Sequence, residues 1–321
     1  MSEPLLTVVL PVRNAAAYLQ RALDSLRAQT FDRFAVLAID DSTDASWEIL
    51  QSVRDPRFTA IRGKARGLAH TLNQGLALAS TPYVARMDAD DRSLPERFAR
   101  QFEALEADAR LLLVGSQARV IDAADAPIGP LVALDDDAAI RRAFAVMNCF
   151  VHGSVVFRRE AVLQAGGYRP VFAEDYDLWR RVAERGRVAN HPDILYEWRA
   201  NPAGASRSRR AEQRKVIEAL ADDVWQAWFA ETGPAPREAW PEIWRPGLDP
   251  RYASNLHLLF ARGYLKRGRR SLAFSHVRAA LALRPRSFAG WAYAGALSLP
   301  PRWFIALEGQ ARTLVEQRRE W

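Results

Sequence analysis

One short stretch constrains this chain most: residues 83–91 (YVARMDADD), which end in three carboxylates within four residues. The apolar start of the stretch is typical of a β-strand. On an extended backbone Asp88 and Asp90 point to the same side, because side chains two positions apart share a face. Like charges this close repel each other, and a divalent cation that prefers oxygen ligands removes the conflict. The stretch predicts a strand that ends at a metal site, although an isolated run of this kind also describes an acidic, solvated loop.

Composition bounds the class of protein. With 321 residues, 49% hydrophobic and 26% charged, the chain can form one large domain, or one domain with an appendage. Its single cysteine, Cys149, excludes a disulfide framework and a thiolate zinc cluster, and it favours the reducing cytoplasm. The first ten residues lack the basic region of a secretory signal, and no run of about 18 apolar residues predicts a membrane span.

The charge balance is basic, with a net charge of +7 and a pI near 9.9. Arginines are scattered along the whole chain, and the sequence contains no zinc finger, aromatic RNA-binding signature or basic zipper. We therefore predict no nucleic-acid partner. Anionic small molecules or anionic lipid fit the charge at least as well.

The order of the apolar segments predicts an α/β fold. Apolar runs at residues 6–12 and 34–39 are each followed by a helical pattern, at residues 15–29 and 45–53. This is the βαβα pattern of a mostly parallel sheet flanked by helices. Asn14 stands directly before the first helical pattern, and we expect it to cap that helix.

Acidic residues follow the second apolar run, where Asp40, Asp41 and Asp44 occur within five residues. In open sheets of this kind ligands bind beyond the carboxyl ends of the strands. Capping of the next helix accounts for Asp44 but leaves Asp40 and Asp41 unexplained. These two carboxylates are candidates to accept hydrogen bonds from a base or a ribose.

A third unit consists of a short strand at residues 58–61, a basic loop with Arg62, Lys64 and Arg66, and a helix at residues 68–79. The basic side chains either face a diphosphate or form a solvated surface. Asn73 and Gly75 interrupt the helical pattern, where glycine costs about 1 kcal/mol relative to alanine. We therefore expect close packing or the close approach of a ligand at this position.

Five short motifs follow one another along the chain: LPVRN at 10–14, DDSTD at 40–44, LNQG at 72–75, ARMDADD at 85–91 and PERF at 95–98. In this order they resemble the glycosyltransferases of family 2, whose nucleotide-diphospho-sugar transferase fold is called GT-A. The resemblance covers residues 5–215. The family has an aromatic residue where this chain has Arg13.

The resemblance implies a donor site and a metal site. It places Pro11 and Asn14 beside a uridine pocket and Asp41 on the base. Asp88 and Asp90 correspond to the D-x-D motif that holds Mg²⁺ or Mn²⁺ against the diphosphate. The residues expected to bind the nucleotide-sugar are Pro11, Asn14, Asp40, Asp41, Arg66, Asn73, Asp88 and Arg199.

A second acidic motif, AEDYDLWRR at residues 173–181, resembles the family's E-D motif at the start of a helix. The resemblance makes Asp175 the general base for an acceptor hydroxyl, with Glu174 orienting or binding the acceptor. Capping by the helix dipole explains an acid here as well. His152 begins a segment that resembles the part of the family's chain that leads back to the active site. This histidine either contacts the substrate or has a structural role. Arg199 lies in a loosely matching closing segment that lacks the family's usual histidine, and it could cover the diphosphate.

The C-terminal part differs in composition. We divide the chain into a GT-A domain at residues 1–215 and a helical region at residues 216–321 that is rich in tryptophan and arginine. Residues 258–285 resemble one tetratricopeptide unit, which cannot bury its own apolar face alone. Aromatic residues mixed with arginine suit a domain interface, or peripheral contact with an anionic membrane.

These observations predict a metal-dependent, inverting glycosyltransferase of the hexosyltransferase type that acts in polysaccharide or cell-envelope biosynthesis. Its donor would be a nucleotide-diphosphate sugar, a UDP-sugar by preference, and its acceptor a hydroxyl of a glycan or of a lipid-linked acceptor. We expect it in the cytoplasm or at the inner face of the membrane. The alternative is an inactive nucleotide-sugar-binding or helical docking protein. A Rossmann dehydrogenase is excluded because no G-x-G-x-x-G follows the first strand.

Overall fold

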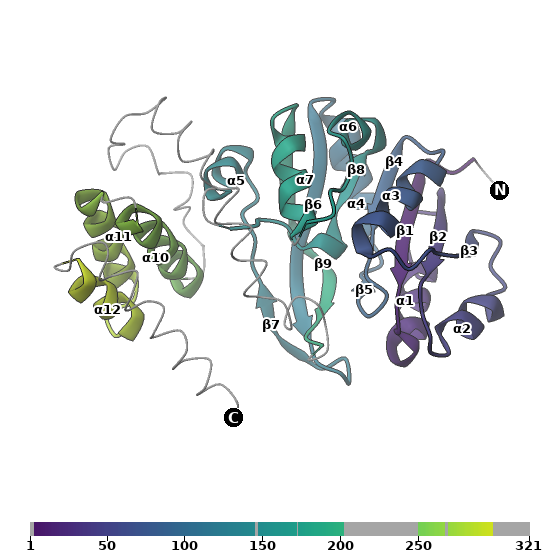
Figure 1. Ribbon diagram of the computed structural model, residues 1–321, viewed down its shortest axis with the longest axis horizontal. Helices are drawn as coiled ribbons and strands as arrows, with labels where there is room; N and C mark the ends of the chain where they lie inside the picture. Colours follow the sequence, from purple (N-terminus) through teal and green to yellow (C-terminus); the bar gives the residue numbers. More distant parts are fainter. Residues whose placement is uncertain (1–2, 145–146, 172, 202–249, 267–268, 298–321) are drawn as a thin grey trace. The chain divides into compact units, whose positions relative to one another are not determined.

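The computed structural model describes residues 3–144, 147–171, 173–201, 250–266 and 269–297 (Figure 1). The chain divides into two units, residues 1–224 and 225–321, which are described separately below. The predicted domain boundary at residue 215 lies outside the described residues and stays a prediction.

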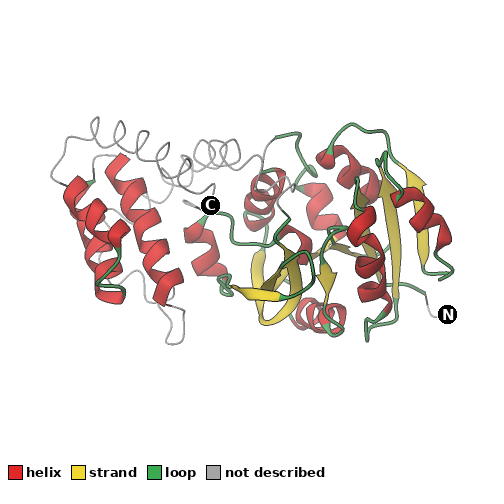
Figure 2. Cartoon of the chain, turned by 90° about the horizontal axis from the view of Figure 1, so that it is seen from below, coloured by secondary structure: helices red, strands yellow, loops and turns green. Residues whose placement is uncertain are grey.

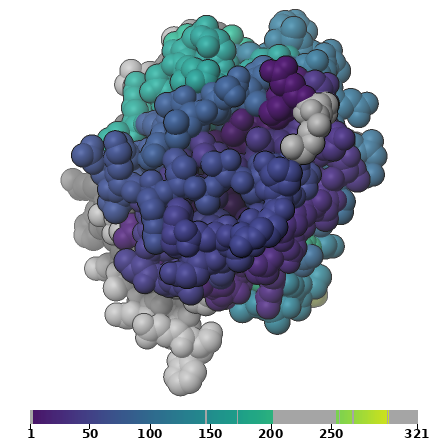
Figure 3. Space-filling view, turned by 90° about the vertical axis from the view of Figure 1, so that its right-hand side faces the viewer, coloured from purple at the N-terminus to yellow at the C-terminus, as the bar shows by residue number. Residues whose placement is uncertain are grey.

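Four parallel strands in the order β3-β2-β1-β4 form the first half of the sheet in the N-terminal unit. Helices connect these strands and lie against the sheet (Figure 2). The elements are β1 Leu6–Val12, α1 Ala16–Arg27, β2 Phe34–Asp40, α2 Ser46–Ser52, β3 Phe58–Arg62, α3 Leu68–Leu78 and β4 Tyr83–Arg86. This is the predicted βαβα order, and Figure 3 views the face that these elements build, coloured purple to blue.

Side chains of β1 alternate between the two faces of the sheet, and both faces are covered. Val8 and Leu10 belong to one buried core together with Leu23 of α1. Val9 points to the opposite face, where α3 packs so closely that a Cβ atom at Gly75 would lie 2.4 Å from Val9 Cγ1. The predicted close packing at Gly75 is confirmed, and it brings α3 directly onto the sheet.

The second half of the sheet is mixed. It continues the order as β4-β8-β6-β9-β5, with β8 antiparallel to both neighbours and β9 parallel to β6. The α/β fold is confirmed, and its parallel part is mainly the first four strands. The elements are β5 Arg92–Ser93, α4 Arg97–Ala107, β6 Leu111–Ile121, β7 Pro127–Leu131, α5 Asp137–Ala143, the 3-10 helix His152–Ser154, β8 Val156–Arg158, α6 Arg159–Gln164, α7 Glu174–Ala183 and β9 Arg187–Arg199.

Three helices form the described part of the C-terminal unit: α10 Pro250–Lys266, α11 Arg270–Leu283 and α12 Phe288–Ala296. Ala261 and Tyr264 of α10 and Ala273 and Ala280 of α11 are buried, so the two helices share an apolar stripe. The helical character of this region is confirmed, and its tetratricopeptide resemblance stays a prediction. Within the described parts of the chain, none of the helices has the length and apolar character that a membrane span requires.

Candidate active site

The acidic run begins directly after β4, and its last member has a structural role. Asp91 is buried, and its carboxylate accepts hydrogen bonds from the Tyr196 hydroxyl at 2.8 Å and from the Arg199 backbone N–H at 2.7 Å. Both donors lie on β9. Asp91 therefore fastens the acidic loop to the second half of the sheet.

Asp88 and Asp90 are the two carboxylates of the run that remain for a ligand. Asp88 is 32% exposed and accepts a hydrogen bond from the Arg86 guanidinium. Asp90 accepts one from the Asn201 amide at 3.1 Å. Burial, and then the negative charge of Asp88, raise the pKa of Asp90 above its usual value. Without a cation, the negative charges of Asp88 and Asp90 repel each other.

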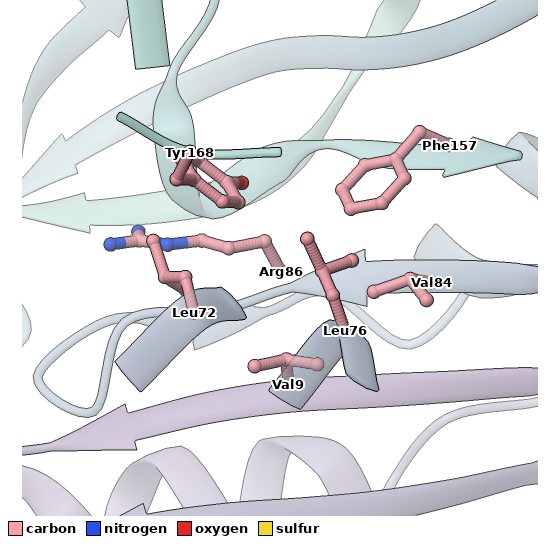
Figure 4. A pocket seen from close by; sticks show the side chains of 7 residues that line it. All are labelled: Val9, Leu72, Leu76, Val84, Arg86, Phe157 and Tyr168. Atoms are coloured by element: carbon pink, nitrogen blue, oxygen red, sulfur yellow. The ribbon is translucent and has the colours of Figure 1, made fainter. Parts of the chain in front are cut away.

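Arg86 places a buried positive charge behind the acids. The guanidinium projects from the end of β4 beside Leu72 and Tyr168, in a small pocket whose other lining side chains are apolar (Figure 4). Only 2% of the residue is exposed. Because Arg86 hydrogen-bonds Asp88, the orientation of that carboxylate is fixed from inside the protein.

A turn held by Asn73 leads into the second acidic motif. Gly166 and Gly167 both have positive φ angles, of 85° and 65°. The Asn73 amide donates to the Tyr168 carbonyl at 2.7 Å and accepts from the Tyr168 N–H at 2.9 Å. Asn73 was predicted to bind the nucleotide-sugar, but both polar atoms of its side chain hold this turn. Its position in the structure is that of a clamp between α3 and the segment before α7.

Glu174 and Asp175 at the start of α7 form a compact cluster with His152 of the 3-10 helix. The ligand-type atoms of these three residues lie within 4.8 Å of one another and could hold a metal ion. His152 Nδ1 is 3.7 Å from Glu174 Oε1, and its Nε2 is 3.3 Å from the Tyr168 hydroxyl. The Asn148 amide donates to Asp175 Oδ2 at 2.6 Å. The two acids of the E-D motif thus have separate neighbours that orient them.

Burial shifts the pKa values in this cluster in the direction that favours the uncharged form of each side chain. It raises the pKa of Glu174 to about 7, with further contributions from the charges of Asp175 and Asp88. The pKa of Asp175 is raised too, mainly by burial. The pKa of His152 lies well below its usual value because burial and the nearby Arg86 oppose its protonation. Carboxylates with raised pKa values are suited to accept a proton near neutral pH.

Arg86 at the end of β4 lines the same pocket as Tyr168, whose hydroxyl lies 3.3 Å from His152 Nε2, so the end of β4 lies close to the acidic cluster at the start of α7. The D-x-D residues come from the first half of the sheet and the E-D residues from the second. Acids from two distant parts of the chain therefore share one site around a buried arginine.

The loop after β2 lies at the carboxyl end of the same sheet, and Asn14 holds it. The Asn14 side-chain oxygen accepts from the Thr43 N–H at 2.9 Å, and the Asn14 N–H donates to Ser42 Oγ at 2.8 Å. The prediction that Asn14 caps the first helix is wrong. Its φ of 51° turns the chain, and Asp44 accepts the hydrogen bond of the first helical N–H, that of Ala16, at 3.0 Å.

The predicted nucleoside readers already have protein partners. Asp40 is buried and pairs with Arg62 at 2.6 Å. Asp41 accepts from the Ala65 N–H at 2.7 Å and from the Thr71 hydroxyl at 2.8 Å, which ties β2 to the loop before α3. Of the other candidates, Pro11 lies opposite Ile39 at the end of β1, and Arg66 is exposed on that loop.

Arg199 is placed differently from its predicted position over the diphosphate. Its side chain is 0% exposed. The guanidinium donates to the Asp90 and Asp122 carbonyls at 2.6 and 2.5 Å and pairs with Asp125 at 2.5 Å. Because these partners enclose it, Arg199 supports the acidic loop from inside the protein.

Arg97 supports the site as well, although in the sequence it stands out only as part of the PERF motif. Its buried guanidinium donates to the Arg86 carbonyl at 2.7 Å, to Ser93 Oγ at 2.8 Å and to Gln101 Oε1 at 3.1 Å. The signal in the sequence was an arginine beside Phe98 on the apolar stripe of a helix. An arginine in that position either extends to solvent or needs several acceptors.

Comparison with known proteins identifies the family. A family model described as glycosyl transferase family 2 matches residues 7–164. The amylovoran biosynthesis glycosyltransferase AmsE of Erwinia amylovora is 33% identical over 190 residues, which are 57% of this chain and 70% of that protein. The chain belongs to glycosyl transferase family 2.

Further similarities agree with this assignment. The O-antigen biosynthesis glycosyltransferase WbnJ of Escherichia coli is 29% identical over 185 residues, 56% of this transferase and 71% of that protein. Among solved structures, S. aureus TarS 1-349 in complex with UDP-GlcNAc has a TM-score of 0.58 at 15% identity, covering 91% of this chain and 92% of TarS. The mannosyltransferase PcManGT from Pyrobaculum calidifontis, in complex with GDP-Man and Mn²⁺, has a TM-score of 0.55 at 23% identity, covering 100% and 84%. The GT-A fold predicted from the five motifs is confirmed.

Proposed function

We propose that this glycosyltransferase moves a sugar from a UDP-sugar to a hydroxyl of a glycan or of a lipid-linked glycan, with inversion at the anomeric carbon. The observation that carries the proposal is the proximity of the two acidic motifs: Arg86, which hydrogen-bonds Asp88, lines the same pocket as Tyr168, whose hydroxyl lies 3.3 Å from His152 Nε2 in the second acidic cluster. A site of this kind needs one set of groups for the leaving diphosphate and another for the incoming hydroxyl.

We assign the metal site to Asp88 and Asp90. Their carboxylate oxygens suit a hard cation, and the raised pKa of Asp90 beside Asp88 indicates a surplus of negative charge that a cation relieves. Mg²⁺ or Mn²⁺ bound there would stabilise the negative charge of the diphosphate. Arg86 holds Asp88 in place from behind, and Asp91 anchors the loop, so the two ligands keep a fixed orientation.

Asp175 is our candidate for the general base. Asn148 donates to Asp175 Oδ2 and so orients the carboxylate, which would accept the proton of the acceptor hydroxyl. As the acceptor oxygen forms its bond to the anomeric carbon, the bond from that carbon to the diphosphate oxygen breaks, and the diphosphate leaves with the electron pair. The proton of the hydroxyl moves to Asp175. Attack from the side opposite the leaving group inverts the anomeric configuration.

Glu174 and the loops at the carboxyl end of the first strands complete the site. Glu174 lies in one cluster with Asp175 and His152, where it would orient the sugar or the acceptor. Pro11, Asn14, Asp41 and Arg66 lie at the strand ends where α/β proteins bind nucleotides. We assign Pro11, Asn14 and Arg66 to the nucleoside and diphosphate, whereas Asp40 and Asp41 support the loops through Arg62, Ala65 and Thr71.

We further place the transferase in the cytoplasm, at the inner face of a membrane where lipid-linked acceptors are found. Cys149 is a free, buried thiol, which suits a reducing compartment. This placement is a proposal about location and is separate from the chemistry of the site.

The proposal is tested by incubating the full chain with a panel of UDP- and GDP-sugars, with Mg²⁺, with Mn²⁺ or with EDTA. We expect transfer or slow donor hydrolysis with a UDP-sugar only when a divalent cation is present. NMR of the product should show an anomeric configuration opposite to that of the donor. A product with retained configuration, or equal rates in EDTA, would contradict the mechanism. Tight donor binding without turnover for any acceptor would favour the alternative of a nucleotide-sugar-binding protein.

A further inference from the structure

Charge is distributed unevenly along this chain. Residues 250–297 contain nine lysines and arginines and no aspartate or glutamate. The whole chain has 45 basic and 38 acidic residues, so the remainder has 36 basic and 38 acidic residues and a net charge of −2. The basic character of the protein therefore comes from the region of the three C-terminal helices. A region with cations and no acids of its own cannot neutralise itself by internal ion pairs.

The turn between α11 and α12 combines this charge with exposed apolar side chains. Phe288 is 88% exposed, Trp291 is 61% exposed and Leu283 is 40% exposed. Arg284 and Arg286 lie between them in the sequence, and Arg286 is exposed. We call these five residues the elbow surface. Large apolar side chains at such exposure, side by side with arginines, mark an interaction surface.

The backbone of the elbow surface is fixed by local contacts. Ser287 caps α12 by accepting a hydrogen bond from the Gly290 N–H at 3.2 Å. A Cβ atom at Gly290 would lie 2.7 Å from Leu281, so α12 packs closely on α11. The Trp291 indole N–H donates to the Pro285 carbonyl at 2.8 Å. Because its polar group is satisfied within the turn, the indole ring can enter an apolar medium without losing a hydrogen bond.

We propose that the elbow surface docks this transferase on an anionic membrane. The aromatic rings would enter the boundary between headgroups and acyl chains, and the arginines would lie among anionic headgroups. Nucleic acid accounts for the arginines, but it does not account for Leu283, Phe288 and Trp291 together at one turn. The inference deepens the proposed location at a membrane and does not depend on the transfer chemistry.

The experiment uses the full chain and sedimentation with vesicles of phosphatidylcholine, with or without phosphatidylglycerol. We expect binding only to the anionic vesicles, and weaker binding as salt rises. The double variant Arg284→Ser/Arg286→Ser should lower the partition coefficient roughly 25-fold, since each arginine near an anionic surface contributes roughly fivefold. Phe288→Ser/Trp291→Ser should abolish binding at moderate salt.

Two matched controls lie in the N-terminal unit. Arg100→Ser/Arg110→Ser removes the same charge from side chains that are 46% and 79% exposed and paired with acids. Leu78→Ser/Ile128→Ser removes apolar side chains that are 56% and 63% exposed. We expect both controls to bind vesicles like the wild type. UDP affinity, measured in parallel, should be the same in all four variants, so a failure of membrane docking and a failure of the proposed function remain distinguishable.

Several results would overturn the docking proposal. Equal binding to neutral vesicles, equal losses in the control variants, or no vesicle binding would each do so. Competition by a short oligonucleotide that the elbow variants abolish would assign the surface to nucleic acid. If Phe288→Ser/Trp291→Ser dissociated a dimer, or lowered the melting temperature by several degrees, the surface would be an interface between copies or units of the protein.

Discussion

Two acidic runs end the strands that flank β1, and in sequence they look alike: DDSTD after β2 and DADD after β4. In the first run the protein supplies a partner for each acid. Asp40 pairs with Arg62, and Asp41 accepts two hydrogen bonds. Burial alone would raise the pKa of Asp44, but hydrogen bonds from Ser46 and Ala16 outweigh it, and that pKa lies below its usual value.

In the second run the protein supplies fewer hydrogen-bond donors for the carboxylates. Asp91 accepts two hydrogen bonds from β9, yet burial and the charges of Asp88 and Asp90 raise its pKa well above the usual value. Burial and the charge of Asp88 also raise the pKa of Asp90. Glu174 and Asp175 are two further acids, both half-buried, whose pKa values are raised. Two acidic motifs with similar sequences can therefore differ in function. An acid that accepts hydrogen bonds from the protein holds a loop, whereas an acid with few protein donors is available for a ligand, and the motif sequence does not reveal the number of donors.

The largest effect that this comparison predicts concerns Asp175. Asp175→Asn keeps the volume of the side chain and its contact with Asn148, but it removes the proton acceptor. We expect transfer in single-turnover experiments to fall by about 10² to 10⁴, as is usual when a general base is lost, with donor affinity nearly unchanged. An Asp175→Asn enzyme as fast as the wild type would remove Asp175 from the mechanism and direct attention to Glu174.

The next effect concerns the metal. Asp90→Ala should weaken Mn²⁺-dependent binding of UDP by roughly tenfold to a hundredfold, equivalent to about 1.5 to 3 kcal/mol for a contact to a charged group. The fold should stay intact, because the change relieves repulsion between Asp88 and Asp90. Calorimetry with and without Mn²⁺ measures the effect, and Asp193→Ala at an exposed position of β9 is the control. Equal UDP affinities with and without Mn²⁺, both in the wild type and in Asp90→Ala, would refute the D-x-D assignment.

Asp41 tests the other side of the comparison, because its carboxylate holds a loop. Asp41→Ala removes the acceptor of the Ala65 N–H and the Thr71 hydroxyl, and we expect a loss of about 2 to 3 kcal/mol in the free energy of unfolding. Thr71→Val, which removes one of these bonds, should cost roughly half as much. Denaturant titration provides both numbers. If Asp41→Ala were as stable as the wild type, the contrast between the two acidic runs would not hold.

The fold was predictable because it depends on local patterns. The apolar runs at residues 6–12 and 34–39 became β1 and β2 with boundaries close to those predicted, and the five motifs led to the correct family. β9 spans Arg187–Arg199, but only its second half has a strand-like apolar pattern, because its first half contains Asn190, Pro192 and Asp193. β7 lies within residues 122–137, a turn-rich, acidic segment whose pattern favours a surface loop over a strand.

The sequence proposes the acids of the site but not the residues that support them. Asp88, Asp90, Glu174 and Asp175 stand in motifs, so the sequence singles them out, and their roles stay predictions. The roles of Asn73 and Arg199 depend on partners 95 and 109 residues away in the chain, at Tyr168 and Asp90, and no local pattern encodes such pairs. Both residues were assigned to the ligand because a polar side chain that supports a site and one that contacts a ligand have the same appearance in a sequence.

The smallest effect is the pH dependence that Glu174 adds to stability. Its pKa is about 7 in the folded protein, above its usual 4.5, so between these values the folded state keeps a proton that the unfolded state has lost. Glu174 therefore destabilises the fold increasingly as the pH rises from 4.5 to 7, and fully above 7. In EDTA, Glu174→Gln should exceed the wild type in stability by about 1 to 2 kcal/mol at pH 8, less than the shift alone implies because the side chain is 17% exposed. At about pH 4 the two proteins should be equal in stability, since a protonated glutamate resembles glutamine.

The control is Glu184→Gln, at an exposed position beyond the other end of the same helix, and its stability relative to the wild type should show no such trend with pH. A difference between Glu174→Gln and the wild type that stayed constant across this pH range would mean that the pKa of Glu174 is not raised by folding, and the contrast between the two acidic runs would then rest on the raised pKa values of Asp90, Asp91 and Asp175.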